Sequence, residues 1–304
     1  MGFETFDDSW RMGNFNYLNK FIEDEYEPKS YYSNYMEKYS GIFKNSTDKN
    51  VIEWQVRHRR ALKELFASAS FFIESKKALD AKQFPSYYFL SYYCYFHILL
   101  GNLFLKPEMK VDELLNITHS KVINVFESNF CKGRFRIIKN DARKEFETLK
   151  FMREYYSYNM PLNEYLDEVE DLMHPNDFLE DSIKPLFQLI SLHSLMLEKS
   201  YNKHLNSIQK TLEGTSLHNY IVSTFHKING VKHPYKDIIL LDWSDKRYLN
   251  EMRTYGYTIE YILADMEHFM DDFRCTGKDS HVDDKINIFV EQVLFDFVRA
   301  NKSR

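Results

Sequence analysis

The stretch that decides the fold runs from Phe84 to Leu105 and reads FPSYYFLSYYCYFHILLGNLFL. It is apolar on nearly every side, so it predicts a buried helix. Pro85 lies at an early helical position and Pro107 follows the end, which are the places where helices accept proline. Many of its residues carry hydroxyl groups, so it is a poor membrane span. We therefore expect the central helix of a bundle, and no membrane association.

Helical patterns continue on both sides of this stretch. Apolar residues recur at spacings of three, four and seven from Asp48 to about Ala81. The outer face of that helix is expected to be basic at Arg57–Lys63. Other helices are expected over 119–130, over about 137–158, after Asn176 or Asp177, and from Ser244-Asp245 to about Phe273, with a short strand at most over 237–243.

Composition supports an all-α protein. The chain has 304 residues with 44% apolar residues, and only 9 glycines and 7 prolines, which are too few for an all-β fold. We expect three parts: a helical extension over residues 1–47, broken into two short helices at Pro28, a helical bundle over 48–200, and a C-terminal helical region over 201–304. The apolar residues of the extension are scattered, so it is expected to pack on another part of the chain.

Charge and cysteine content restrict the function classes. The net charge of -5 excludes a globally basic nucleic-acid coat but leaves room for a local basic groove. The three cysteines are far apart and form no CxxC pair, which argues against a zinc or disulfide framework and favours a reducing, cytoplasmic compartment. No P-loop, GxGxxG, HExxH or GxSxG motif is present. We expect no metal site and no cofactor.

Three short elements, in order along the chain, resemble HEPN domains (higher eukaryote and prokaryote nucleotide-binding). Residues 91–103 read SYYCYFHILLGNL, which is similar to the tyrosine-rich helix of that family. His119, Val122 and Phe126 resemble an H-x-x-V-x-x-x-F element, and 153–158, REYYSY, resembles R-x-x-x-D-Y. The resemblance covers roughly residues 60 to 200. It implies an HEPN-like helical bundle that forms a homodimer.

The resemblance also suggests catalytic residues. HEPN ribonucleases use R-x4–6-H, in which the arginine binds the scissile phosphate and the histidine serves in acid–base cleavage of RNA. Here the positions after Arg153 hold Tyr158, Asn159 and Met160, and Ser157 replaces the aspartate. The candidate catalytic residues are Arg153, Tyr158, Asn159 and His119, which would supply the missing acid–base group if its helix meets Arg153.

Two of these residues, and His97 in the tyrosine-rich stretch, also have a structural interpretation. Arg153 can pair with Glu154 or Asp167, Tyr158 can pack in the core, and His97 can be a buried, hydrogen-bonded histidine. The pair Arg274 and His281 also matches R-x6-H, but it lies outside the resembling region and one such match is expected by chance.

Basic residues precede Arg153, with aromatic residues between them, a pattern that suits single-stranded RNA. The candidate nucleic-acid-binding residues are Arg134, Arg136, Lys139, Arg143 and Lys150, which together with Arg57–Lys63 could line one groove. The alternative is an ordinary charged helix face, because Asp141, Glu145 and Glu147 dilute the charge.

Two functions remain open. The first is an RNA-targeting toxin or prokaryotic defence effector that cuts or binds RNA without a metal. The second is a non-catalytic adaptor that dimerises through the HEPN-like core. In the second case, the acidic stretch 162–181 would dock a basic protein partner.

Overall fold

The computed structural model describes residues 15–23, 26–132, 136–159, 175–262, 266 and 284–299. Within these residues the regular secondary structure is helical apart from one small two-stranded sheet, which confirms the all-α class. The α-helices are α1 (Asn16–Asn19), α2 (Tyr26–Phe43), α3 (Asp48–Asp80), α4 (Phe84–Phe104), α5 (Val111–Leu115), α6 (His119–Phe126), α7 (Ala142–Glu154), α8 (Pro175–His204), α9 (Gly214–Asn229), α10 (Trp243–Tyr255) and α12 (Asp284–Arg299). Shorter elements are the π-helical turns η2 (Glu127–Cys131) and η3 (Tyr155–Asn159), the 3-10 turn η5 (Leu205–Ser207), and strands β1 (Val231–Lys232) and β2 (Ile239–Leu240).

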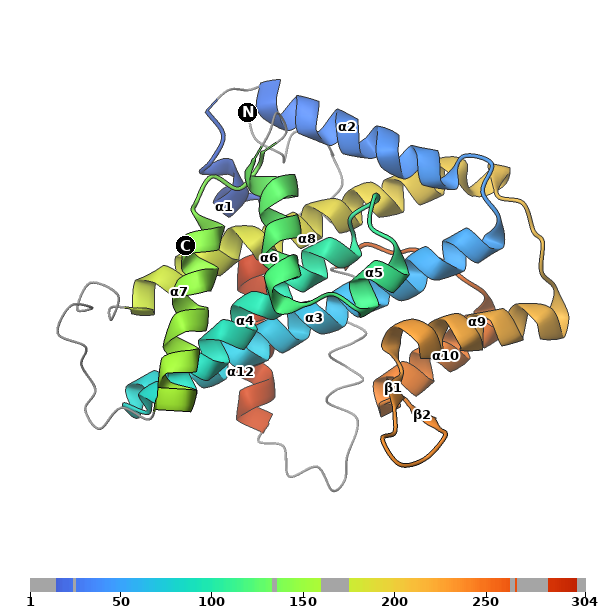
Figure 1. The fold of residues 1–304 in the computed structure, drawn as a ribbon. Coiled ribbons are helices and arrows are strands. Elements are labelled where there is room, and N and C mark those ends of the chain that lie inside the picture. The colour runs from blue at the N-terminus through green and yellow to red at the C-terminus, as the bar shows by residue number, and fades with distance from the viewer. Residues whose placement is uncertain are drawn as a thin grey trace.

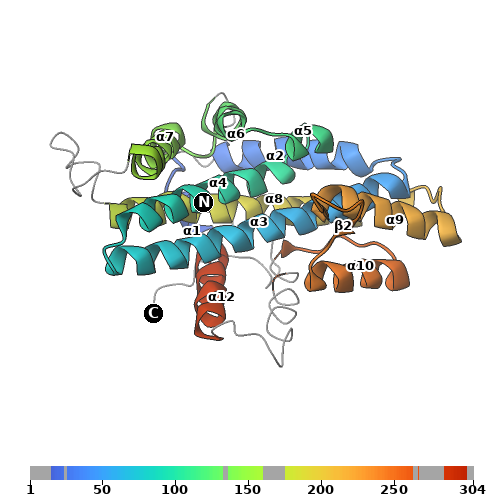
Figure 2. The same ribbon diagram turned by 60° about the horizontal axis from the view of Figure 1, so that its bottom comes forward.

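Helices α3 and α4 form a long hairpin at the centre, and α8 lies beside it (Figure 1). Their bounds agree closely with those expected from the sequence. Gly101 allows the three helices to approach one another, because a Cβ there would lie 2.8 Å from Ile190 Cδ1 and 3.2 Å from Glu64 Cβ. The other elements cover this hairpin: α6 and α7 contact α4, while α9 and α12 contact α3 (Figure 2).

The N-terminal extension packs on α8, as expected, but α2 is not broken at Pro28. Proline lies in the first turn of α2, where its missing N–H is not needed. Tyr31, Tyr35 and Tyr39 recur every four residues and are buried against α8. The two nitrogens of His193 on α8 lie 2.7 Å from Tyr31 Oη and 2.8 Å from Tyr39 Oη. The extension therefore has a regular buried stripe of tyrosines, although its apolar residues look scattered in the sequence.

The prediction of a basic outer face on α3 was wrong for three of its five basic residues, whereas Arg60 and Lys63 are partly exposed. Arg57, His58 and Arg59 are all buried. Arg57 donates hydrogen bonds to the carbonyls of Phe104, Lys106 and Met109, at 2.9, 2.9 and 3.0 Å. This guanidinium satisfies carbonyls at the end of α4, a position in which five fixed N–H groups are an advantage. These buried residues cannot line a groove.

Two expectations for the C-terminal part also change. The helix expected to run to about Phe273 ends at Tyr255, and Gly256 follows with a φ of +88°, a conformation that favours glycine. The strand expected over 237–243 is only Ile239–Leu240, and it pairs antiparallel with Val231–Lys232. One continuous hydrophobic core extends from Phe15 to Val298 among the described residues. The part boundaries at 47/48 and 200/201 stay predictions.

None of the described helices combines the length and the apolar character needed to cross a bilayer.

Candidate functional site

Arg153 lies in the last turn of α7, which packs on α4. Asp141 caps the helix by accepting a hydrogen bond from Lys144 N at 3.0 Å, so the helix begins at Ala142 and not near residue 137. The Arg153 guanidinium carbon lies 4.3 Å from the centre of the Tyr92 ring on α4. Arg153 Nη2 also contacts Glu154 Oε1 at 3.1 Å, and the arginine side chain is 14% exposed. Arg153 is thus held by an aromatic face and by one exposed carboxylate.

His119 reaches the same tyrosine from α6. Thr118 caps this helix by accepting a hydrogen bond from Lys121 N, and Val122, Ile123 and Phe126 are buried on its inner face. His119 Nδ1 lies 2.5 Å from Tyr92 Oη, and the imidazole ring centre lies 4.3 Å from that of Phe96. Arg153 and His119, which are 34 residues apart in the sequence, therefore meet at the face and the hydroxyl group of Tyr92.

The electrostatics of this cluster favour neutral groups beside one fixed cation. Burial, with the charges of Arg153, His97 and Lys150, lowers the pKa of His119 below its ordinary value. Burial raises the pKa of Tyr92 to about 12, although the charge of Arg153 acts in the opposite direction. Near pH 7 the imidazole is therefore neutral and able to accept a proton, and the phenol keeps its own proton.

A second histidine lies next to this cluster. His97 Nδ1 contacts Glu64 Oε2 at 2.5 Å, and Glu64 is only 2% exposed. The other carboxylate oxygen contacts Arg60 Nη2 at 2.6 Å. The His97 ring stacks on Phe71 with a centroid distance of 5.3 Å, and its side chain is 22% exposed. His97 is hydrogen-bonded, as the structural interpretation expected, but it is only partly buried.

The proposed RNA-contacting residues differ in their surroundings. Lys150 lies one helical turn before Arg153 on α7, and its charge acts on His119. Arg143 is engaged by Glu127 and Asn124, at 2.8 and 2.6 Å. Lys139 contacts the carboxylates of Glu23 and Glu27, at 3.0 and 3.3 Å. Arg136 is exposed, and Arg134 lies outside the described residues. Of the five, Lys150 has the clearest link to the Arg153 cluster.

Tyr158 and Asn159 face solvent at the end of the π-helical turn η3. Tyr158 is 78% exposed, so it is not a core residue. Tyr156 takes the buried position instead, with its ring 5.4 Å from that of Tyr88.

Several expectations fall on undescribed segments. Residues 162–174 of the acidic stretch, which include Asp167, lie outside the described residues, as do Arg274 and His281. Glu180, near the end of that stretch, pairs with Lys76 and with Lys184.

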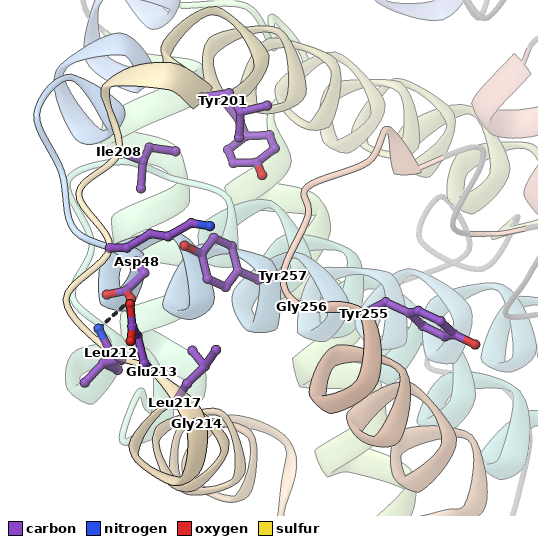
Figure 3. A pocket seen from close by; sticks show the side chains of 12 residues that line it. Asp48, Tyr201, Ile208, Leu212, Glu213, Gly214, Leu217, Tyr255, Gly256 and Tyr257 are labelled. Carbon is purple, nitrogen blue, oxygen red and sulfur yellow. Dashed lines mark hydrogen bonds between the residues drawn. The ribbon is translucent and has the colours of Figure 1, made fainter.

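A separate cavity of about 460 Å³ lies between the start of α3, the end of α8, the start of α9 and the end of α10 (Figure 3). Tyr201, Tyr257 and Leu217 are among its lining residues. The carboxylate of Asp48 accepts hydrogen bonds from Leu212 N at 2.9 Å and from Thr211 N at 3.1 Å. The polar groups of Asp48 therefore join the segment 209–212 to α3. At this cavity Asp48 is a structural residue.

Sequence reasoning missed Tyr92 and Glu64 as members of the site. Tyr92 was visible within the tyrosine-rich stretch, but nothing in the spacing distinguishes it from its neighbours. Glu64 lies one position after Lys63 on a helix expected to be basic outside, so no local signal indicates a buried carboxylate. Among the described residues, no group of three or more His, Cys, Asp and Glu side chains is placed to hold a metal ion.

Comparison with protein-family models, with curated proteins and with solved structures finds no match for this chain.

Proposed function

We propose that this protein is an RNA-targeting effector that cleaves RNA by transesterification at a centre formed by Arg153 and His119. The observation that carries the proposal is their common contact with Tyr92, at 4.3 Å from the ring centre and 2.5 Å from the hydroxyl. The resemblance to HEPN domains over residues 60–200 agrees with this reaction class. The motif histidine missing after Arg153 is replaced by one from α6.

In this proposal Arg153 binds the scissile phosphate. A guanidinium matches two phosphate oxygens with parallel N–H groups. Its present partner, Glu154, is 43% exposed. An ion pair at the surface contributes only about 0–1 kcal/mol, so a phosphate can replace that carboxylate. Tyr92 stays beneath the guanidinium and keeps it oriented.

His119 acts as the general base. Its lowered pKa leaves the imidazole neutral near pH 7. When Nδ1–H donates to Tyr92 Oη, the lone pair of Nε2 is free to accept the proton of the ribose 2′-hydroxyl. Tyr92 is a positioning residue, because its hydroxyl holds the orientation of the His119 ring. This chemistry uses a neutral imidazole, a cation and the RNA's own 2′-hydroxyl, and the departing 5′-oxygen takes up a proton to become a hydroxyl.

The adaptor function is the second candidate, and two observations favour it. Arg143, Lys139 and Arg153 already contact carboxylates, so the basic surface is largely neutralised. Exposed aromatic residues, Phe151 and Tyr158, lie close to Arg153 in the sequence and suit a protein partner. In either case, the resemblance predicts a homodimer.

The test is cleavage of a mixed tRNA and mRNA pool by the purified protein in the presence of EDTA. We expect cleavage with the wild type that ends in 2′,3′-cyclic phosphates and 5′-hydroxyls. Arg153→Ala and His119→Ala should each reduce the rate by roughly 10²–10⁴-fold. Matched controls are Arg253→Ala on α10 and His218→Ala on α9, which should cleave at the wild-type rate. Absence of cleavage by the wild type would favour the adaptor.

A further inference from the structure

The buried carboxylate of Glu64 beside His97 has no role in the function proposed so far. Glu64 lies on α3 and His97 on α4, and the two helices meet closely at Gly101, one turn after His97. Although burial disfavours its charged form, the hydrogen bond from His97 and the charge of Arg60 lower the pKa of Glu64. A charged carboxylate therefore lies beneath a partly exposed imidazole.

The two histidines border the same aromatic side chains. The Phe96 ring centre lies 5.5 Å from that of His97 and 4.3 Å from that of His119. The Tyr93 ring centre lies 6.2 Å from that of His97 and 6.1 Å from that of His119. The imidazole of His97 on α4 and that of His119 on α6 therefore border the same two aromatic rings.

The hydrogen bonds give the two imidazoles different roles. An ionised carboxylate can only accept, so Glu64 requires a proton on His97 Nδ1. The exchangeable position of His97 is then Nε2, with a negative charge on the opposite side of the ring. His119 has a phenol in the corresponding place and the positive charge of Arg153 nearby. The two imidazoles thus differ in their neighbours, a carboxylate beside His97 and a phenol with a guanidinium beside His119.

We propose that His97 is the general acid of the RNA cleavage and that Glu64 positions it. This inference rests on the function proposed above. His119 Nε2 takes the 2′-hydroxyl proton, the 2′-oxygen bonds to phosphorus, and the bond from phosphorus to the 5′-oxygen breaks. His97 Nε2 gives its proton to that departing oxygen. The products are a 2′,3′-cyclic phosphate and a 5′-hydroxyl, and exchange with water restores both histidines.

Two substrates separate a general acid from a residue that only supports the fold. A dinucleoside phosphate has an alkoxide leaving group that needs a proton, whereas a ribonucleoside 3′-(4-nitrophenyl phosphate) releases a stable phenolate without one. His97→Ala should lower the cleavage rate of the dinucleotide by roughly 10²–10⁴-fold. It should leave cleavage of the nitrophenyl ester close to the wild-type rate. His119→Ala and Arg153→Ala should impair both substrates.

Glu64→Gln tests the positioning role, because an amide oxygen can still accept from His97 Nδ1 while the charge is lost. We expect slower dinucleotide cleavage, with the nitrophenyl ester again spared. Glu251→Gln on α10 is the matched control and should change neither substrate. His97→Gln replaces His97→Ala if the alanine variant does not fold.

Three outcomes would overturn the inference. If His97→Ala cleaves the dinucleotide at the wild-type rate, or loses both substrates equally while folded, His97 is not the acid. The function proposed for Arg153 and His119 would survive either result. If the wild type cleaves neither substrate, the inference falls together with that function.

Discussion

At the scale of single residues, Tyr92 joins the two halves of the candidate centre. Its ring lies under Arg153 and its hydroxyl contacts His119. Tyr92→Phe should keep the stacking but lose the hydrogen bond that fixes the imidazole, so we expect a folded protein whose RNA cleavage is at least about tenfold slower. Tyr88→Phe on the same helix is the matched control, because the buried Tyr88 hydroxyl has no hydrogen-bond partner among the described residues. Equal rates for the two variants would show that the hydroxyl contact is unimportant.

Arg57 shows why a local pattern misled the sequence analysis at this scale. A run of basic residues is usually a solvated face, but the carbonyls at the end of α4 need donors, and only the tertiary fold brings Arg57 to them. Arg57→Ala should lower the free energy of unfolding by about 3 kcal/mol or more, because it leaves buried carbonyls unpaired. Arg253→Ala, an exposed control, should change it by less than about 0.5 kcal/mol. Urea unfolding measures both, and a small effect of Arg57→Ala would refute the capping role.

At the scale of elements, α3 and α4 could be located from the sequence because Asp48, Pro85 and Pro107 mark their ends. The bounds of other helices could not be located from the sequence. Gly256 ends α10 through a positive φ that no nearby hydrophobic pattern indicates, and the α2 stripe is made of tyrosines whose polar ends hide its period. The convergence of α6 and α7 on Tyr92 depends on helix packing, which sequence spacing does not determine.

The contact between α3, α4 and α8 yields a prediction at this scale. Gly101→Ala places a Cβ 2.8 Å from Ile190 Cδ1 and 3.2 Å from Glu64 Cβ, so the helices must move apart. We expect a loss of about 1–3 kcal/mol in the free energy of unfolding. In Gly41→Ala on α2 the added Cβ meets no atom of the described residues within 4 Å, so this substitution should stabilise the helix by up to about 1 kcal/mol. Thermal unfolding of both variants checks this. If both substitutions changed the free energy of unfolding in the same direction, the packing described for Gly101 would be contradicted.

The docking of α2 on α8 predicts a pH dependence of stability. Burial and the charge of Lys106 lower the pKa of His193 to about 3 from its ordinary 6.5. The unfolded chain therefore binds a proton that the folded chain does not, and stability falls as the pH drops from 6.5 towards 3, by about 1.4 kcal/mol per unit. His193→Gln should remove that part of the slope. Urea unfolding at several pH values in this window measures the difference, and parallel slopes would contradict the buried neutral state of His193.

At the scale of the whole molecule, a net charge of -5 means that the proposed RNA binding would rest on a few local contacts. We therefore expect a shallow salt dependence of RNA binding, with a slope in log Kd against log salt that corresponds to about two or three phosphates. Lys150→Ala should lower that slope by about one, because it lies one turn from Arg153 on α7. Arg143→Ala, in which the lost cation already pairs with Glu127, should change it less. Filter binding over a range of salt concentrations would reveal a steep slope if the wider basic surface were engaged.

The most direct test of the central claim is the single-turnover RNA cleavage rate of the double variant Arg153→Ala/His119→Ala in EDTA, set beside the two single variants. Groups that act on one phosphodiester as a unit are non-additive, so the double variant should be little slower than the slower single variant. If the fold-losses in cleavage rate of the two single variants multiplied in the double variant, Arg153 and His119 would act at separate places. Wild-type rates in both single variants would show that Tyr92 joins them for structural reasons alone.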